Sequence, residues 1–313
     1  MNEFAMIRRY FTRPARRARL GVGDDAAVLV PTPGAELLVS TDLLVSGRHF
    51  FADVDPAALG HKTLAVNLSD IAAMGGEPVW AVLGAALPTL DEAWIAAFCD
   101  GLFALAERTG VDIVGGDTTR GPLTLSVTIG GEVPAGQAIR RDGARPGDEI
   151  WVSGQLGLAA AALAHLSGEA RLSAPLLAEC RKRLEWPEPR IGLGMALRGI
   201  ASAMLDISDG FAGDLGHILE RSAVGATVDI DALPSDERLE RAVWRDAIAA
   251  GGDDYELCFT APPAQAAAVC AAAARAGVDV TRVGVIDAAP GLRLLDAQQR
   301  PVHLERNGFD HFA

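Results

Sequence analysis

Apolar residues recur with two periods along this chain, one typical of helices and one typical of strands. Residues 56–74 begin at a proline, which favours the first turn of a helix, and end at Gly75-Gly76, which stops one. Residues 91–109 have the spacing of an amphipathic helix, and residues 79–87 form an apolar run of strand length. The other elements predicted for this part are a helix at 3–12 and strands at 26–30, 36–41, 111–114 and 123–133.

The alternation restarts after residues 134–146, a stretch rich in Gly, Pro and charge that is typical of a domain boundary. Beyond it we predict strands at 149–153, 203–207, 226–230, 256–261 and 280–286, and helices at 156–167, 175–184, 190–201, 209–222 and 264–276. The pattern therefore predicts two α/β halves, which we delimit as an N-terminal domain at 1–135, a linker at 136–147 and a C-terminal domain at 148–313.

Composition argues against several classes of protein. The 313 residues carry a formal net charge of −13, which argues against nucleic acid as a partner because binding a phosphate backbone requires clustered Lys and Arg. No apolar run approaches the roughly 20 residues that span a bilayer, so we expect no membrane segment. The four cysteines are far apart and form no C-x-x-C pair, which favours reduced thiols in the cytoplasm over a disulfide framework or a zinc site.

Aspartates gather at predicted strand ends and in glycine-flanked turns. Any one of them has a structural explanation, since Asp is a favoured turn and helix-capping residue; Asp209, for example, could cap the helix that follows it. Taken together they suggest a ligand site, because ligands of open α/β folds bind at the carboxyl ends of strands. Asp42, Asp117 and Asp206 are predicted to emerge there. Converging carboxylates repel one another unless cations neutralise them, and their oxygens are ligands that Mg²⁺ prefers. The pattern therefore predicts a site for several magnesium ions.

Several familiar catalytic motifs are absent. The chain has no G-x-x-x-x-G-K-[ST] loop, no G-x-G-x-x-G turn between a strand and a helix, no protein-kinase signature and no G-x-S-x-G elbow. Its lysines are Lys62 and Lys182, so nearly all of its 28 basic residues are arginines. If the protein handles a nucleotide, we expect metal ions, backbone amides and arginine to hold the phosphates.

Seven segments, in order along almost the whole chain, resemble the thiamine-monophosphate kinase family. They are GVGDD at 21–25, STDLLVSGRHF at 40–50, HKTLAVNLSD at 61–70, GGDTTR at 115–120, DISDG at 206–210, GDLGH at 213–217 and GDDYELC at 252–258. The resemblance implies the two-domain fold shared with aminoimidazole ribonucleotide synthetase, with a mixed α/β N-terminal domain and an α/β C-terminal domain. It also implies that the γ-phosphoryl group of ATP is transferred to thiamine monophosphate, giving thiamine diphosphate and ADP, by direct in-line transfer assisted by several Mg²⁺ ions.

The resemblance carries site residues over to matching positions. The implied magnesium ligands are Asp25, Ser40, Thr41, Asp42, Asp70, Asp117, Asp206 and Asp209. The implied ATP contacts are Gly116, Asp117, Arg141 and Ser208, and the implied contacts to thiamine monophosphate are His49, Asp253 and Phe309. Two residues depart from the family pattern, in which Glu stands at position 253 and a different aromatic residue at 309. Asp253 therefore reaches one methylene less far, and Phe309 keeps a stacking face without a polar donor.

The resemblance further implies a homodimer joined through its N-terminal domains, with the C-terminal domain completing the nucleotide and substrate site. No residue is expected to act as a general base, because the acceptor is already an anionic phosphate.

Other interpretations of the sequence stay open. Selenophosphate synthetase shares the superfamily but needs a reactive cysteine near its N-terminus, whereas the first cysteine here is Cys99. An amidine-forming synthetase is disfavoured because the matching segments are those of the kinase. A non-enzymatic, acidic cation-binding protein would fit the net charge, but the chain has no EF-hand spacing.

Overall fold

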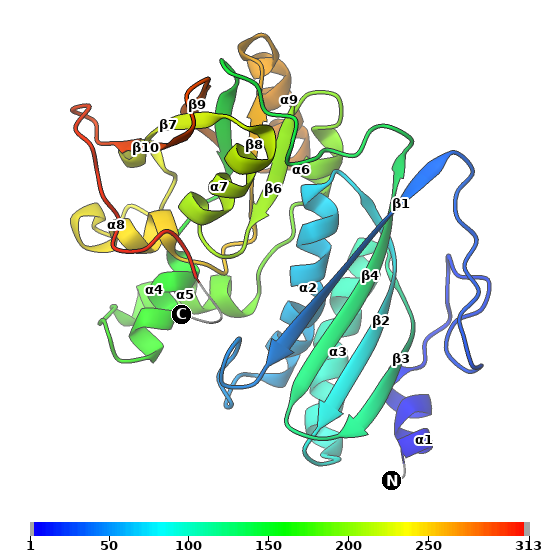
Figure 1. The fold of residues 1–313 in the computed structure, drawn as a ribbon. Coiled ribbons are helices and arrows are strands. Elements are labelled where there is room, and N and C mark those ends of the chain that lie inside the picture. Colours follow the sequence, from blue (N-terminus) through cyan, green and yellow to red (C-terminus); the bar gives the residue numbers. More distant parts are fainter. Residues whose placement is uncertain (1–2, 310–313) are drawn as a thin grey trace. The chain divides into compact units, whose positions relative to one another are not determined.

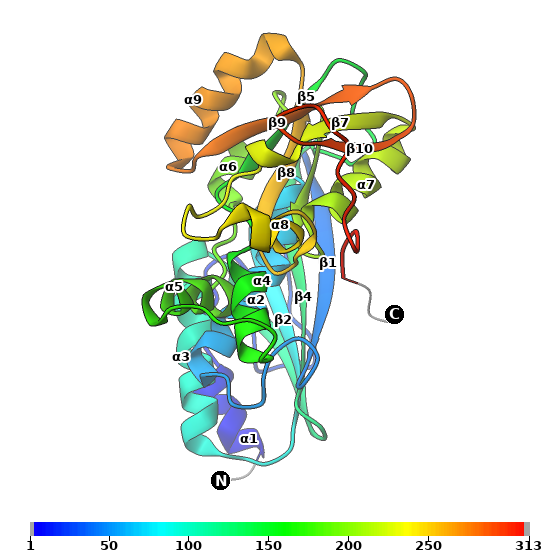
Figure 2. The same cartoon turned by 90° about the vertical axis from the view of Figure 1, so that its left-hand side faces the viewer.

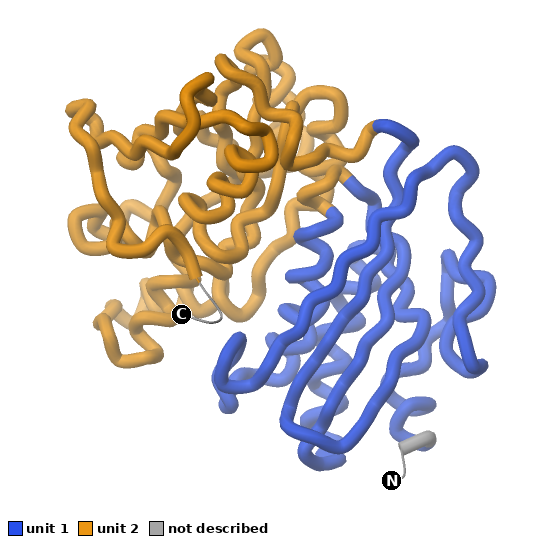
Figure 3. Tube along the Cα trace, in the orientation of Figure 1, with its two compact units in different colours: residues 1–71, 76–136 blue, residues 72–75, 137–313 orange. Residues whose placement is uncertain are grey.

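A computed structural model describes residues 3–309, which form two units (Figure 3). Unit 1 comprises residues 1–71 and 76–136, and unit 2 comprises residues 72–75 and 137–313. The end of the first long helix thus clusters with unit 2, as do residues 137–147. None of the described helices is long and apolar enough to cross a membrane.

Unit 1 is a four-stranded sheet with two helices on one face (Figures 1 and 2). Its strand order is β1-β4-β2-β3, where β4 runs antiparallel to β1 and β2, and β3 runs parallel to β2. The elements of unit 1 are α1 (Glu3–Met6), a π-helical turn (Ile7–Phe11), β1 (Ala35–Val45), α2 (Pro56–Ala73), β2 (Glu77–Leu87), α3 (Glu92–Thr109), β3 (Asp112–Arg120) and β4 (Thr124–Pro134).

Helices α2 and α3 cross so closely that two glycines are required. A Cβ atom added to Gly60 would lie 2.0 Å from the Phe98 carbonyl oxygen, and one added to Gly101 would lie 1.8 Å from the Ala57 carbonyl oxygen. Backbone therefore packs on backbone at this crossing, which is closer than the usual interaxial distance of about 8–10 Å. The crossing holds α2, and with it residue 70, firmly over the sheet.

The opposite face of the unit 1 sheet bears apolar side chains in solvent. Along β1, Leu38 and Leu44 are buried while Leu37, Val39 and Leu43 are 52%, 63% and 54% exposed. Alternation of this kind is expected for a strand with one covered face, but exposed apolar residues on the other face are not. We call this face of the unit 1 sheet the outer face.

Unit 2 is a six-stranded sheet with helices on both faces (Figure 1). Its strand order is β10-β7-β9-β5-β8-β6. The larger core cluster packs α7 and α8 on one face, and a second cluster packs α6 and α9 on the other. The strands are β5 (Glu149–Ser153), β6 (Ala203–Ile207), β7 (Gly225–Asp229), β8 (Glu256–Ala261), β9 (Val280–Asp287) and β10 (Gly291–Leu295), and the helices are α4 (Leu158–Leu166), α5 (Ala174–Glu185), α6 (Ile191–Ala196), α7 (Phe211–Ser222), α8 (Arg241–Ala250) and α9 (Ala266–Ala276), with 3₁₀ turns at Ile230–Ala232 and Pro263–Gln265.

Most predicted elements are present, with four differences. Residues 26–30 form no strand, because the apolar segment finds a single bridge, Leu20 to Val28, in place of a partner strand. The helix predicted at 190–201 ends at Ala196, and the pattern does not predict α8 and β10. Strands β1 and β3 also extend well past the predicted ends, so Asp42 and Asp117 lie within strands and not at their carboxyl ends.

Candidate active site

In unit 1, the predicted metal ligands Ser40 and Asp70 are in contact. The Ser40 hydroxyl donates a hydrogen bond of 2.5 Å to the Asp70 carboxylate, so β1 and α2 present adjacent oxygen atoms. One turn earlier on α2, the Asn67 side-chain oxygen accepts from the Asp42 backbone N–H at 3.1 Å. Asn67 is buried and its amide nitrogen donates to the Thr63 carbonyl oxygen, which holds the amide in this orientation. The helix face with residues 67 and 70 therefore lies along the part of β1 with residues 40 and 42.

Thr41 and Asp117 are not brought to this place. The Thr41 side chain donates to the Val127 carbonyl oxygen and accepts from the Thr128 hydroxyl, both at 3.0 Å, and Thr41 alternates with Ser40 toward the outer face. Asp117 lies on β3, which two strands separate from β1. At about 4.8 Å per strand, roughly 14 Å separates the two strand axes. Within unit 1, one ion cannot therefore bind both Asp42 and Asp117.

Gly116 is a glycine for steric reasons. Its φ is 154°, and a Cβ atom there would lie 2.0 Å from the Leu83 carbonyl oxygen of the neighbouring strand. A side chain at this position would push β3 away from β2. The exposed Asp117 follows directly, so its backbone position depends on the missing side chain before it.

The remaining predicted residues of unit 1 lie in loops. Asp25 is exposed, and its backbone N–H is held by the Asp24 carboxylate at 2.9 Å. His49 is half-buried after the end of β1, where its Nδ1 accepts from the Val45 backbone N–H at 3.0 Å. That bond leaves Nε2 as the proton-bearing nitrogen in neutral His49. His49 can thus offer one N–H donor from the end of β1.

In unit 2, a buried carboxylate organises the turn after β6. One oxygen of Asp214 accepts the backbone N–H groups of Ser208, Asp209 and Gly210 at 3.0 to 3.1 Å. Asp209 is therefore not the residue that caps α7, because Asp214 reaches back from within the helix to do so. Burial raises the pKa of Asp214 to about 6, and the nearby Asp209 charge adds to the rise. The turn presents Ser208 and Asp209 from a backbone whose amide groups are already bound.

Asp206 lies just before this turn, on β6, and is 5% exposed. Two other predicted residues lie beside the turn. Asp253 donates its backbone N–H to the Ser208 carbonyl oxygen at 2.8 Å, and Phe309 donates its backbone N–H to the Asp209 carbonyl oxygen at 2.9 Å. Unit 2 thus brings together Asp206, Ser208, Asp209, Asp253 and Phe309, which come from three separate parts of the sequence.

Arg141 lies elsewhere in the same unit. Its carbonyl oxygen accepts from the Ser222 hydroxyl at 2.9 Å, at the C-terminal end of α7. Ser208 precedes the other end of that helix, and 12 helical residues span roughly 18 Å. The predicted ATP contacts Arg141 and Ser208 are therefore far apart within unit 2.

Oxygen donors suited to Mg²⁺ are present in both units, but no three His, Cys, Asp or Glu side chains of residues 3–309 form a ready-made metal site. The donors are carboxylates, a serine hydroxyl and a buried amide, which fit a hard cation. Water and phosphate oxygens would have to complete each coordination shell, as is usual for Mg²⁺.

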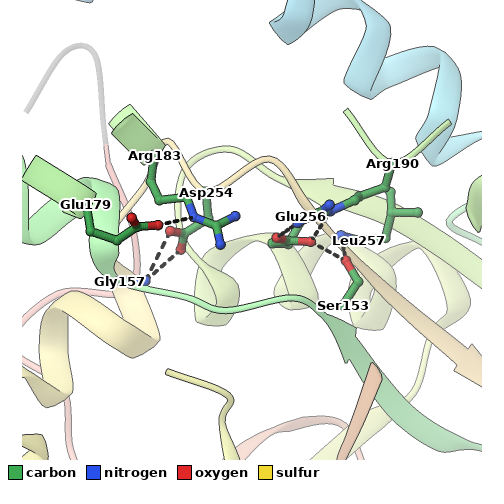
Figure 4. Close-up of polar contacts among 8 residues, drawn as sticks. All are labelled: Ser153, Gly157, Glu179, Arg183, Arg190, Asp254, Glu256 and Leu257. Carbon is green, nitrogen blue, oxygen red and sulfur yellow. Dashed lines mark hydrogen bonds and ion pairs between the residues drawn. The ribbon is translucent and has the colours of Figure 1, made fainter. Parts of the chain in front are cut away.

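Sequence reasoning misses a buried polar cluster behind Asp253 (Figure 4). Asp254 and Glu256 direct their carboxylates to Gly157, Ser153 and Arg190. Within the GDDYELC segment, the sequence predicts a role for the first aspartate alone. The signal that could have found the others is the run of three acids within four residues entering a buried strand, since buried carboxylates need partners.

Comparison with known proteins identifies relatives over nearly the full length. Residues 23–133 match the family model of the AIR synthase related protein N-terminal domain, and residues 145–297 match that of the C-terminal domain. Thiamine-monophosphate kinase of Salmonella typhimurium is 46% identical, covering 99% of this chain and 98% of its own. The enzyme of the same name from Escherichia coli K12 is 44% identical with the same coverage.

Solved structures agree with these matches. A crystal structure of thiamine-monophosphate kinase from Stenotrophomonas maltophilia is 46% identical, with a TM-score of 0.86 over 94% of this chain and 96% of its own. The structure of AaThiL complexed with AMPPCP and TMP is 30% identical, with a TM-score of 0.79 over 90% of this chain and 89% of its own. Structures of the hydrogenase maturation protein HypE, at 21–23% identity, share the fold alone.

Proposed function

The chain belongs to the thiamine-monophosphate kinase family, and from that premise we propose how it transfers the γ-phosphoryl group of ATP to thiamine monophosphate. The chain is an ATP-dependent kinase with the two-domain fold of the AIR synthase related proteins. The structure of AaThiL with AMPPCP and TMP supports an ATP site and an acceptor site in one protein.

The acceptor needs no general base. A phosphate monoester has a second pKa of about 6, so it is mostly a dianion at neutral pH. The difficulty is the approach of two anions, which repel by roughly 4 kcal/mol per pair of unit charges at 4 Å and an effective dielectric constant of 20. When bound, Mg²⁺ would supply the positive charge that offsets this repulsion and hold the attacking and leaving oxygens in line.

Three groups of residues would share the work. Ser40, Asp42 and Asp70 would hold metal ions from unit 1, and Asp25 and Asp117 would contact the phosphates at other points. Thr41, which the resemblance also implies as a ligand, is left out because its hydroxyl is bonded within the sheet on the outer face. Asp206 and Asp209 would hold metal from unit 2, while Gly116, Asp117, Ser208 and Arg141 would contact ATP. Several ions are needed because the carboxylates of β1 and β3 are too far apart to share one. His49, Asp253 and Phe309 would contact thiamine monophosphate.

The observation that carries this proposal is the contact between Ser40 and Asp70, which places a hydroxyl and a carboxylate from two elements side by side. Asp70→Asn should lower kcat by about 100-fold or more, because it removes charge from a site that stabilises the transition state. Its magnesium requirement should shift to higher concentration. The assay is ADP release with ATP, thiamine monophosphate and a magnesium titration.

Asp91→Asn is the matched control in the same unit. Asp91 caps α3 by accepting the Ala93 and Trp94 backbone N–H groups, and Asn caps helices as well as Asp does. Asp91→Asn should keep full activity. If Asp70→Asn keeps kcat within about threefold of the parent at saturating magnesium, the metal role of Asp70 is wrong.

We further propose a cytoplasmic homodimer formed through the outer face of unit 1. The exposed Leu37, Val39 and Leu43 support it, because apolar side chains in a row on an edge strand favour association with another surface. Cys99, Cys180 and Cys258 are buried free thiols, which supports a reducing compartment.

A further inference from the structure

The loop that carries Asp253 is bonded along the end of β6. Tyr255 donates its backbone N–H to the Ile207 carbonyl oxygen at 2.8 Å, next to the bond between Asp253 and Ser208. Gly252 approaches so closely that a Cβ atom would lie 2.4 Å from the Ser208 carbonyl oxygen. Two non-glycine residues of the loop have left-handed backbone, Asp253 at a φ of 67° and Tyr255 at 50°. Side chains disfavour this conformation, so contacts around the loop must maintain it.

Asp254 makes such a contact with the segment that precedes α4 (Figure 4). The Gly157 backbone N–H donates to both carboxylate oxygens of Asp254, at 3.0 and 3.1 Å. Gly157 precedes α4 and itself has a φ of 84°. Asp254 therefore joins two irregular backbone segments, the loop at 251–255 and the start of α4.

Glu256 secures the adjacent strand in a different way. It accepts from the Ser153 hydroxyl at 2.6 Å and from Arg190 Nε at 2.7 Å, with Arg190 Nη2 bonded to its second oxygen. Ser153 in turn accepts the Leu257 backbone N–H at 2.8 Å. Glu256 is thus a buried anion with a bidentate cationic partner, at the start of β8 and beside the last residue of β5.

Asp254 has no comparable bidentate ion pair among residues 3–309. Arg183, whose charge acts on Asp254, pairs with Glu179 at 3.7 Å. Burial raises the pKa of Asp254 well above its usual range, and the charges of Glu256 and Asp253 act in the same direction. A neutral side chain with an oxygen acceptor should consequently serve the Gly157 N–H as well as the native one does. This separates the role of a hydrogen bond at 254 from the role of a charge.

From this geometry we infer that Asp254 is a positioning residue for the phosphoryl acceptor. By accepting the Gly157 N–H it maintains the left-handed turn that directs Asp253 toward thiamine monophosphate. Its effect is on acceptor binding and not on ATP binding. The inference rests on the acceptor contact proposed for Asp253.

Steady-state kinetics with each substrate varied in turn test the inference. Asp254→Ala should raise the KM for thiamine monophosphate about tenfold, the scale of one lost hydrogen bond, with kcat and the KM for ATP within about threefold of the parent. Asp254→Asn should stay within about twofold of the parent in all three constants, because it keeps the acceptor oxygen. Equal increases in both KM values, or an Asn variant as impaired as the Ala variant, would overturn the inference.

A double-mutant cycle separates this inference from the proposed function. If Asp254 acts through Asp253, then Asp253→Ala and the combined Asp253→Ala, Asp254→Ala protein should have the same KM for thiamine monophosphate. Additive effects would overturn the inference while leaving the acceptor contact intact. An Asp253→Ala protein with an unchanged KM would instead remove the acceptor contact itself, and the inference with it.

Glu256→Gln is the control for general weakening of the buried cluster. It breaks the ion pair with Arg190, so its melting temperature should fall while the ratio of the two KM values stays that of the parent. The same ratio change in Glu256→Gln as in Asp254→Ala would overturn the specific role of Asp254. Should Asp254→Ala fail to fold, Asp254→Ser replaces it, since a hydroxyl on one carbon cannot reach the Gly157 N–H, and the same change in ratio is expected.

Discussion

At the scale of single residues, Asp214 illustrates what the sequence leaves undecided. The segment DISDGFAGD offers two carboxylates able to bind the N–H groups at the start of α7, and sequence rules favour Asp209 by its position. The structure uses Asp214, because Gly210 has a φ of 126° and turns the chain so that three N–H groups point at one oxygen from within the helix. Asp214 thus takes the capping role that the sequence rules would give to Asp209.

Contacts between residues far apart in the sequence differ in how far the sequence predicts them. Ser40 contacts Asp70, and the Phe309 backbone N–H donates to the Asp209 carbonyl oxygen, while the shared site that the resemblance implies for these residues stays a prediction. The run of acids at 253–256 indicates that Asp254 and Glu256 need partners. Their partners, Arg190 among them, cannot be identified from residue types until the register of the strands is known.

A prediction at this scale concerns stability and pH. Desolvation raises the pKa of Asp254 in the folded protein, and the carboxylates of Glu256 and Asp253 add to the rise, opposed by the Gly157 N–H and Arg183. In the unfolded chain the carboxyl ionises near pH 4, so above that pH the unfolded state binds fewer protons than the folded state. The contribution of Asp254 to the free energy of unfolding therefore decreases as the pH rises from about 4 toward its folded-state pKa.

Asp254→Asn removes this dependence. Its melting temperature relative to the parent protein should increase by about 2 °C or more between pH 5 and pH 8 in thermal unfolding followed by fluorescence. Asp91→Asn, at an exposed capping position, is the control for replacing a carboxylate by an amide elsewhere in the chain. A difference for Asp254→Asn that is constant, or larger at pH 5, would contradict the assignment of a raised pKa.

At the scale of elements, the apolar pattern and the turn residues predicted the bounds of a strand correctly where the segment pairs with a strand of similar length. Strands β5, β6 and β8 have the predicted bounds, since each is a largely apolar run that is buried along almost its whole length. Residues 26–30 have the same composition but no strand to pair with. The edge strand β10 and α8 were missed because they are only five and ten residues long, so each has few repeats of its period.

The crossing of α2 and α3 gives a prediction for elements. Gly101→Ala places a methyl group against the Ala57 carbonyl oxygen, so the helices must move apart, at a cost of about 2–3 kcal/mol. The midpoint of the calorimetric unfolding transition that involves unit 1 should fall by about 5 °C. Gly216→Ala is the matched control, because no heavy atom lies within 4 Å of the new Cβ atom in α7.

Gly216→Ala should instead stabilise the protein by about 1 kcal/mol, since alanine is the better helix former. The two variants must therefore change the free energy of unfolding in opposite directions. A neutral Gly101→Ala would mean that the helices do not approach as closely as the structure has them.

At the scale of the whole molecule, the sequence predicted two α/β units but not their strand orders. Both sheets are mixed, and β4 lies between β1 and β2 although it follows β3 in the chain. Such an arrangement depends on which edges are left open after earlier pairings, which local patterns do not encode. The same strand order separates Asp42 from Asp117. The carboxylates that were predicted to converge at strand ends are therefore apart within unit 1.

The proposed homodimer gives a prediction at this scale. Light scattering after size exclusion at micromolar concentration should give twice the chain mass of 32.7 kDa. Val39→Asp, on the outer face, should lower the mass toward one chain, because it places a charge where an apolar contact is proposed. Val243→Asp is the matched control, since Val243 is 68% exposed on α8 of the other unit, and it should leave the mass unchanged. A parent protein with the mass of one chain would refute the homodimer.

The left-handed backbone at residue 253 has a consequence for how this position can vary. Aspartate and asparagine tolerate such dihedral angles better than longer side chains do, and glycine adopts them freely. A Glu at 253 would gain reach toward a ligand but strain the main chain. Replacement by Gly would relax the main chain and abolish the carboxylate. A residue that adopts the left-handed backbone easily at 253 therefore has a short side chain or none, whereas a longer acid strains the main chain. Aspartate keeps a carboxylate on a backbone conformation that it tolerates.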